Sequence, residues 1–417
     1  MRAAASVFRW MTNDPRTIAV YALLVLWCAI AFSLAIAEIA TVVSLVFWLI
    51  WRFREGIVWP QIRPVIFAPL AAYVLICLVS LVWTESPKES YRGIFKVLKY
   101  AVMFWMGAEI FEWDQARKKF ETVFCLFYAV LVVDGFVQYL FGRDLLRWVA
   151  LQDASAGPRV SASFKSFGLL ASYLIATLPY LGALCVQARR QGRRLWFWIY
   201  LFSALGGTVL LILTRSRGAV LAFLIGWFLF LILTRKFKWF AVSGLLALSL
   251  LFVIPKSMII HQNAEGEEQS LVERYYLWDR AVHVIKARPW TGTGINTYVA
   301  THAKYDRTQN WRVRDYYAHN GYLQAAAETG VPSILFLLVC IGSYFFRSCR
   351  AGGCARGGGA NNLVCDGLLL GLANFLMLTL VDTVFHNPQA VMVFWYLLGL
   401  QLAYAERGDK SSMSFSK

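Results

Sequence analysis

The sequence has few charged residues for its length. Of its 417 residues, 16% are Asp, Glu, Lys or Arg, whereas 59% are hydrophobic and 16% are aromatic. Soluble globular domains average about 25% charged residues, and this chain is long enough for about a dozen membrane spans of roughly 20 residues. The scarcity of charge therefore excludes a soluble globular protein and indicates an all-α integral membrane protein.

The sequence also lacks the motifs of several enzyme classes. Metal-dependent sugar transfer commonly uses Asp-x-Asp, and this motif is absent, as are His-Glu-x-x-His, Gly-x-Ser-x-Gly and Gly-x-x-x-x-Gly-Lys-Ser/Thr. The eight cysteines lie in apolar segments or in the Arg/Gly-rich linker after Phe346, and none lies in the polar region 256–330. We therefore expect no metal site, no cofactor and no disulfide framework.

Apolar runs predict about twelve transmembrane helices. The first two runs are barely separated, and a single helix across both would exceed the thickness of a bilayer, so we expect a hairpin that turns at Ala37-Glu38. The chain then divides into helices 1–9 (residues 1–255), one large loop (256–330), and helices 10–12 with a tail (331–417). The runs fall at about 17–35, 38–51, 65–83, 97–111, 120–141, 167–187, 195–214, 218–234, 239–255, 331–346, 363–384 and 389–405.

The basic residues alternate along the chain in a way that predicts its orientation. If the N-terminus is inside, every inner segment is basic and the short outer turns at 37–38 and 385–388 carry no Lys or Arg, as the positive-inside rule expects. Both termini are then cytoplasmic. The net charge of +17 is explained by this topology and by contact with anionic membrane lipids. No nucleic-acid motif is present, so nucleic acid is not an expected partner.

The remaining basic residues fall on the predicted outer side. Arg215 and Arg217 lie between two apolar runs with almost no loop, where guanidinium groups are costly unless an anion pairs with them. Snorkelling to lipid headgroups is the alternative. We interpret the lysines of the segment 90–100 as headgroup anchors of this kind. The concentration of Arg and Lys on this side predicts an anionic partner there.

The large loop is predicted to contain an amphipathic helix over 271–287. Pro289 ends the helix, and Trp290 to Gly294 forms a turn. Arg274 and Arg280 are six residues apart and point to different faces, so we expect only one of them to look inward. Resting on the bilayer by its aromatic face, the helix would cover a cavity. The residues at helical spacing are Leu271, Tyr275, Trp278, Val282 and Ile285.

His319 is the candidate base. It precedes an Ala-rich segment that is predicted to be helical and that leads into the apolar run from Ser333 to Phe346. The positive end of the helix dipole disfavours imidazolium, so the neutral, proton-accepting ring is favoured. For a lone histidine, a capping or packed side chain is the alternative interpretation. Tyr317 and Asn320 flank His319 as supporting residues.

Several short motifs, in this order, resemble the O-antigen ligase and polymerase superfamily. The resemblance implies an enzyme with a GT-C-like fold that needs no metal. It would transfer O-antigen polysaccharide from undecaprenyl diphosphate to a sugar hydroxyl of lipid A-core, at the periplasmic face of the bacterial inner membrane. The motifs are Arg-Ser-Arg-Gly-Ala at 215–219, Arg274-x-x-x-Trp278, Pro289-x-x-Gly292-x-Gly294, and His319-Asn320 followed by Gly330.

The resemblance also assigns roles to individual residues. His319 matches the essential histidine of the family, Arg274 the arginine of the loop, and Arg215 or Arg217 the arginine at the start of the eighth span. Arg159 resembles a further family position. These arginines would bind the diphosphate, because a guanidinium can hold two phosphate oxygens at once, and Arg280 would support them.

Three other functions remain open from the sequence. A polymerase or a protein O-oligosaccharyltransferase of the same superfamily would differ only in its acceptor. A flippase for the lipid-linked sugar would be expected to place ionisable groups along the span interiors and on both sides of the membrane. Here the unusual charges gather at one face, which favours an enzyme.

Overall fold

The computed structural model describes residues 14–57, 64–152, 157–233, 269–306, 317–352 and 360–414. Over these residues the chain is helical, and the only β-type contacts found there are two isolated bridges, Arg143 with Ala150 and Gln152 with Arg159. The predicted apolar run 239–255 lies outside the described residues.

Every other predicted apolar run overlaps a helix, although the run 363–384 is α-helical only as far as Leu378. In the large loop, the predicted helix 271–287 is observed as α12. The helices are α2 (Pro15–Phe32), α3 (Leu34–Arg54), α4 (Pro64–Val79), α5 (Pro87–Ile110), α6 (Asp114–Phe141), α7 (Phe167–Arg190), α8 (Arg194–Leu213), α9 (Arg217–Leu233), α12 (Gln269–Ala287), α13 (Tyr298–Thr301), α14 (Gly321–Thr329), α15 (Val331–Gly352), α16 (Ala360–Leu378) and α17 (Pro388–Ser414), with 3-10 turns η1 (Ser80–Trp83), η2 (His302–Lys304) and η4 (Val384–His386).

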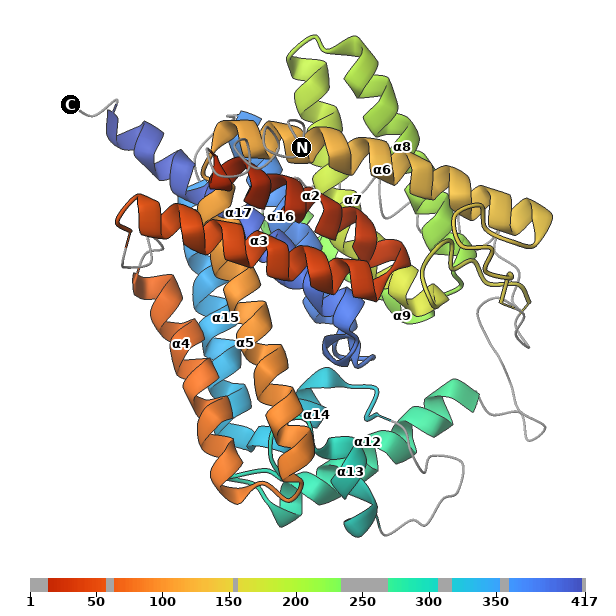
Figure 1. The fold of residues 1–417 in the computed structure, drawn as a ribbon. Helices are drawn as coiled ribbons and strands as arrows, with labels where there is room; N and C mark the ends of the chain where they lie inside the picture. Colours follow the sequence, from red (N-terminus) through yellow and green to blue (C-terminus); the bar gives the residue numbers. More distant parts are fainter. Residues whose placement is uncertain are drawn as a thin grey trace, which may run out of the picture.

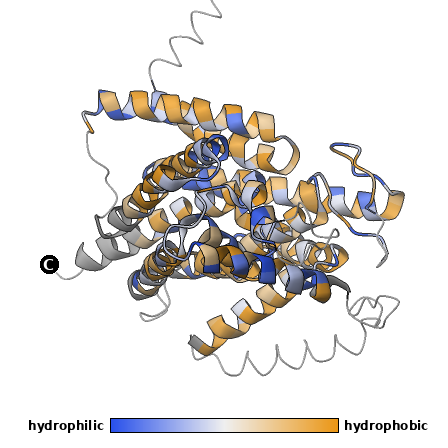
Figure 2. Cartoon of the chain, turned by 90° about the horizontal axis from the view of Figure 1, so that it is seen from below, coloured by the Kyte–Doolittle hydropathy of each residue, from blue (hydrophilic) through white to orange (hydrophobic). Residues whose placement is uncertain are grey.

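Six described helices are long and apolar enough to cross a membrane. Shorter apolar helices add to them, at Leu70–Trp83, Arg217–Ile232 and Leu363–Leu378. Figure 2 shows hydrophobic residues along the helices at the periphery of the molecule. The prediction of an all-α, multi-pass membrane protein is therefore confirmed. The six are α2, α3, α6, α7, α8 and the Val331–Ser348 part of α15.

The first hairpin turns earlier than the sequence predicted. Ser33, in an extended conformation, separates α2 from α3, and its side chain accepts a hydrogen bond from the N–H of Ile36 at 3.4 Å. Ala37 and Glu38 lie inside α3, so the predicted turn at these two residues is wrong. Serine competes for backbone hydrogen bonds and caps helices well, and this short-range effect outweighed the apolar pattern.

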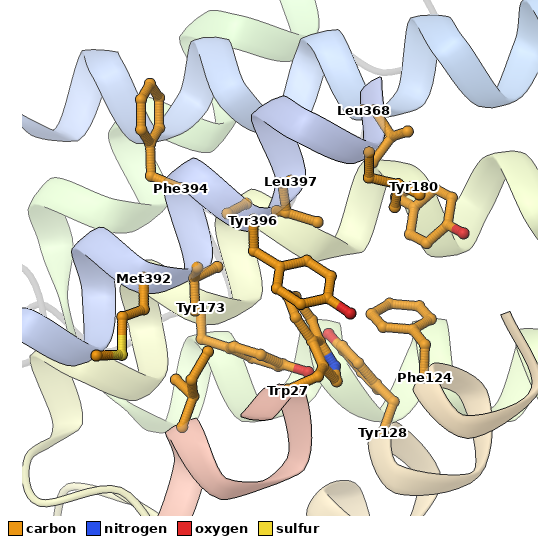
Figure 3. Packing of buried hydrophobic residues seen from close by; sticks show 14 of the residues in the cluster. Trp27, Phe124, Tyr128, Tyr173, Tyr180, Leu368, Met392, Phe394, Tyr396 and Leu397 are labelled. Atoms are coloured by element: carbon orange, nitrogen blue, oxygen red, sulfur yellow. The ribbon is translucent and has the colours of Figure 1, made fainter. Parts of the chain in front are cut away.

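An aromatic cluster holds the centre of the helical bundle. The indole of Trp27 on α2 is fully buried and its ring centroid lies 4.9 Å from that of Tyr396 on α17, 5.6 Å from that of Tyr173 on α7 and 5.2 Å from that of Phe120 on α6 (Figure 3). Such ring pairs contribute about 0.5–1.5 kcal/mol each beyond the burial of their area. The cluster therefore joins α2, α6, α7 and α17.

The loop helices gather at one end of the molecule. In Figure 1, α12, α13 and α14 lie together below the bundle, next to the ends of α4 and α5. Ser90 of α5 donates to the carbonyl of Ile295 at 2.9 Å, and Glu85 donates its N–H to the carbonyl of Thr293 at 2.8 Å. The loop is thus attached to the bundle through the start of α5. We refer to this end as the loop end.

Both lysines of the segment 90–100 have partners inside the protein. Lys96 Nζ donates to Oδ1 of Asn296 at 3.1 Å, and Lys99 Nζ forms an ion pair with Oε1 of Glu38 at 2.6 Å. The prediction of a headgroup anchor is therefore wrong for Lys99, whereas for Lys96, whose partner is a neutral amide, it stays a prediction. The sequence could not show these partners, because Asn296 and Glu38 lie about 200 and 61 residues away along the chain.

Candidate functional site

The first turn of α14 fixes the position of His319. Asn320 is the N-cap of this helix, and its Oδ1 accepts hydrogen bonds from the N–H groups of Tyr322 and Leu323, each at 3.0 Å. His319 precedes the cap in a left-handed conformation, with φ at 47°, which costs an L-residue about 1–2 kcal/mol. The predicted helix, and the place of His319 at its start, are confirmed.

Gly321 lets this helix start pack against the end of α16. Its N–H donates to the carbonyl of Thr379 at 2.8 Å, and a Cβ at this position would lie 2.5 Å from Cγ2 of Thr379. A side chain would therefore push α14 away from α16. In the sequence His319-Asn320-Gly321, the first residue presents an imidazole, the second caps the helix, and the third allows the close contact.

Asp382 is the partner of His319, and the sequence analysis did not identify it. Its Oδ1 lies 3.3 Å from Nδ1 of His319 and also accepts the N–H of Thr383 at 2.7 Å. When Nδ1 carries the proton and donates it to this carboxylate, Nε2 keeps a lone pair and can accept a proton. A signal was present, because Asp382 is an ionisable residue in an apolar run, which by itself suggests a function.

The loop helix α12 lies directly against His319. The indole Nε1 of Trp278 donates to the carbonyl oxygen of His319 at 3.3 Å. Arg274 lies one turn earlier on the same face of α12, and its side chain is half-buried. Among the described residues, no carboxylate forms an ion pair with Arg274. Arg274 and His319 thus lie on facing elements, and no described carboxylate neutralises the charge of Arg274.

Arg280 occupies the other face of α12, as the spacing predicted. Its side chain is 1% exposed, its Nη2 lies 2.6 Å from Oδ2 of Asp306, and its Nη1 lies 3.3 Å from Nδ1 of His302. Ala281 and Val284, the neighbours of Arg280 on α12, pack against Ala327 of α14. Arg280 therefore joins segments of the loop to one another inside its small core.

Arg215 and Arg217 form the junction between α8 and α9. Arg215 is in the left-handed conformation, with φ at 53°, and Arg217 is the first residue of α9. Gly218 packs closely on the α16–α17 connection, since a Cβ there would lie 3.0 Å from Cγ2 of Val381. Asp382 is the next residue after Val381. The same connection thus contacts His319 and the start of α9.

Arg159 joins this junction from the loop between α6 and α7. The N–H of Val160 donates to the carbonyl of Leu213 at 3.1 Å, which attaches the loop to the end of α8. Burial lowers the pKa of Arg159, and the positive charges of Arg217 and Arg215 lower it further. The guanidinium stacks on the ring of Phe167, with its carbon 4.6 Å from the ring centroid.

The backbone of Gly157 also belongs to this arrangement. Gly157 has φ at 90°, and a Cβ there would lie 2.5 Å from Nη1 of Arg215. The structure therefore brings together the three arginines predicted at 159, 215 and 217. Neither Arg159 nor Arg215 forms an ion pair with any described carboxylate. Three cations at close range repel one another, so a bound anion would stabilise this cluster.

The Gly-x-Gly turn after Pro289 holds the far end of α14. The N–H groups of Thr293 and Gly294 donate to the carbonyls of Ala327 and Glu328, at 3.0 and 2.8 Å, and so cap the end of the helix. A Cβ on Gly292 would clash with the carbonyl of Glu328. The predicted turn is confirmed, and this close contact explains Gly292, whereas Gly294 packs against Thr84 and Ser90.

Glu328 is a second buried acid that the sequence analysis missed. Its side chain is 3% exposed; Oε2 accepts the N–H of Asn296 at 2.7 Å, and Oε1 accepts from Gln324 Nε2 at 3.2 Å. His386 Nε2 lies 3.4 Å from Oε1, and the His386 ring lies 5.3 Å from that of Tyr317. Tyr317 is half-exposed and connects this network with His319 along the chain.

No group of three or more His, Cys, Asp or Glu side chains that could hold a metal ion is found in the described part of the chain. The charged groups that the structure brings next to His319 are the carboxylate of Asp382 and, on the facing helix α12, Arg274.

Comparison with known families identifies the segment that carries this site. Residues 201–338 match the family model described as O-antigen ligase. The matched segment contains Arg215, Arg217, Arg274 and His319, whereas Arg159 and Asp382 lie outside it. A search of curated proteins gives no match. The match supports a relationship of this segment, on an all-helical membrane fold, to the O-antigen ligase superfamily.

Proposed function

We propose that this protein is an O-antigen ligase that transfers a polysaccharide from undecaprenyl diphosphate to a sugar hydroxyl of lipid A-core. The proposal places the loop end at the periplasmic face of the inner membrane and both termini in the cytoplasm. The observation that carries it is the contact of one connection, Val381-Asp382, with both His319 and the start of α9. A candidate base and a cationic cluster thus share one end of the molecule.

In the proposed reaction, Nε2 of His319 accepts the proton of the acceptor hydroxyl as its oxygen bonds to the anomeric carbon of the donor sugar. The bond between that carbon and the diphosphate oxygen breaks, and the electron pair leaves with the diphosphate. Asp382 stabilises the imidazolium that forms, as a carboxylate does for a catalytic histidine. General-base catalysis of this kind typically contributes about 10²–10⁴ in rate.

The arginines would stabilise the charge that develops on the leaving diphosphate. Arg159, Arg215 and Arg217 lie together, and Arg274 lies on the helix that contacts His319. Planar guanidinium groups bind phosphate oxygens in pairs and act without a metal ion. Asn320 and Tyr317 would support His319, the first as a cap and the second through its contact with His386.

Reconstitution tests the proposal directly. Purified protein is incubated with undecaprenyl-diphosphate-linked polysaccharide and lipid A-core, and the glycolipid is resolved by size. A ladder of conjugated lipid A-core that is lost in His319→Ala supports a ligase. Elongated lipid-linked polysaccharide without any conjugate would show a polymerase, and a glycosylated protein acceptor would show an oligosaccharyltransferase. Movement of the donor across vesicles with no new glycosidic bond would show a flippase.

A further inference from the structure

An apolar cavity lies between α4, α5, α14, α15 and α17. Its volume is about 220 Å³, and it is partly open to its surroundings. Along α15 the lining runs from Ile334 to Arg347, which at 1.5 Å per residue is about 20 Å. Tyr100, Leu337 and Ile341 are among the side chains that line it. The cavity therefore has the length and the lining for a lipid chain.

One end of the cavity is polar and lies at the loop end of the molecule. Lys96, Asn296, Glu328 and His386 line it there. Glu328 is satisfied inside the protein by the N–H of Asn296 and by Gln324. The only hydrogen-bond partner that the described residues give Lys96 Nζ is Oδ1 of Asn296, and no described carboxylate forms an ion pair with it. A cation without an anionic partner among the described residues thus lines the polar end of an apolar cavity.

This combination fits a phosphorylated lipid. The chain would displace water from the apolar lining, and the phosphate would pair with the ammonium group of Lys96. A basic residue near an anionic lipid surface contributes about 1 kcal/mol to binding. A neutral lipid would leave Lys96 with the amide oxygen of Asn296 but with no anion beside it.

The position of α14 decides between the two lipid substrates of the proposed reaction. Gly321 and Ala325 of α14 line the cavity, together with Thr379 of α16. Gly218, the residue after Arg217, packs on the next stretch of the α16–α17 connection, at Val381. The isoprenoid chain of the donor is bonded directly to the diphosphate, so it must begin at the arginines. In the acceptor, the core sugars separate the acyl chains from the reacting hydroxyl.

We propose that this cavity binds an acyl chain of the acceptor glycolipid, with a phosphate of that lipid at Lys96. His319, at the start of α14, then stands between the donor on the arginine side and the acceptor on the cavity side. This assignment rests on the proposed function for the identity of the acceptor.

Photolabelling tests the assignment without turnover. Lipid A-core that carries a diazirine in one acyl chain is added to the full-length His319→Ala variant in nanodiscs, irradiated, and mapped by peptide mass spectrometry. Labels are expected on the segments of α5 and α15 that line the cavity, and unlabelled lipid A-core should compete.

Matched variants locate the site. Leu337→Trp fills the cavity and should abolish the labelling, whereas Val339→Trp, at a position 66% exposed on the outside of the same helix, should not change it. Lys96→Gln should weaken binding of bisphosphorylated lipid A about five-fold. The same variant should leave binding of dephosphorylated lipid A unchanged, which separates the charge from any effect on folding.

Three results would overturn the assignment. The first is absence of labelling, and the second is equal competition by phosphatidylglycerol. The third is that undecaprenyl diphosphate with a diazirine in its chain labels the same segments and that Leu337→Trp abolishes this labelling. Failure of polysaccharide transfer by the wild-type protein would instead count against the proposed function, because the labelling requires no transfer.

Discussion

Nδ1 of His319 lies 3.3 Å from Oδ1 of Asp382, although the two residues are 63 positions apart in the chain. His319 is held by the cap of α14 and by the indole of Trp278, and Asp382 is held by the N–H of Thr383. The pair orients the imidazole so that Nε2 is the nitrogen available for chemistry. Its consequences for the proposed reaction can be measured.

Asp382→Asn should lower the transfer rate about 10- to 100-fold, since the amide keeps the shape of the side chain but not the charge that orients and stabilises the histidine. Initial rates at saturating donor check this. Asp279→Asn is the matched control, because Oδ2 of Asp279 lies 3.4 Å from Nδ1 of His283 in an equivalent contact elsewhere on the loop. Equal rates for Asp382→Asn and wild type would remove Asp382 from the mechanism.

Arg274→Lys and Arg217→Lys should each lose most of the transfer activity. Lysine keeps the positive charge but replaces the planar fork that holds two phosphate oxygens by a single compact ammonium group. Arg288→Lys is the control: it lies in the same loop, is half-exposed, and contacts Glu85 at 3.6 Å. The measurement is kcat/KM for the donor in each of the three lysine variants. Tolerance of lysine at 159, 215, 217 and 274 together would mean that the diphosphate is held elsewhere.

Arg280→Ala should act on stability before it acts on chemistry. Removal of one partner from a buried ion pair costs about 3–5 kcal/mol, because Asp306, whose side chain is 12% exposed, would lose the positive charge beside it. We expect a lower melting temperature and faster hydrogen exchange in α12 and η2. The double variant Arg280→Met with Asp306→Leu should recover part of the stability. A fully stable but inactive Arg280→Ala protein would instead place this arginine on the substrate.

Local sequence patterns were enough to predict the elements that carry the site. The α12 and α14 helices, the turn at Pro289 to Gly294, and the opposite faces of Arg274 and Arg280 all follow from spacing over a few residues. Local spacing does not predict the contacts of Asp382 and Glu328 or the partners of Lys96 and Lys99. Each depends on a contact between distant segments, and a single sequence contains no signal for the pairing of residues that lie far apart.

Transfer should proceed at its full rate in EDTA. The proposed reaction uses arginines to stabilise the leaving diphosphate, so removal of divalent ions should leave the initial rate unchanged. Rates are compared with and without EDTA, and after addition of magnesium or manganese. A rate that falls in EDTA and returns with either ion would show that a metal stabilises the diphosphate.

Gly157→Ala should impair transfer by displacing Arg215. The new Cβ would lie 2.5 Å from Nη1 of Arg215, so the guanidinium would have to leave its place beside Arg159. Alanine would also strain the backbone at this position, because Gly157 has φ at 90°. Gly142→Ala controls for that strain, since Gly142 has φ at 80° and no other atom lies within 4 Å of where its Cβ would stand.

Both glycine variants should therefore lose a similar stability, about 1 kcal/mol. Only Gly157→Ala should raise KM for the lipid-linked donor and lower kcat, because only that variant moves a cation of the cluster. Arg215→Ala in the Gly157→Ala background should cause little further loss, as expected when two changes remove the same interaction. Equal donor kinetics for Gly157→Ala and Gly142→Ala would show that the position of Arg215 does not matter for transfer.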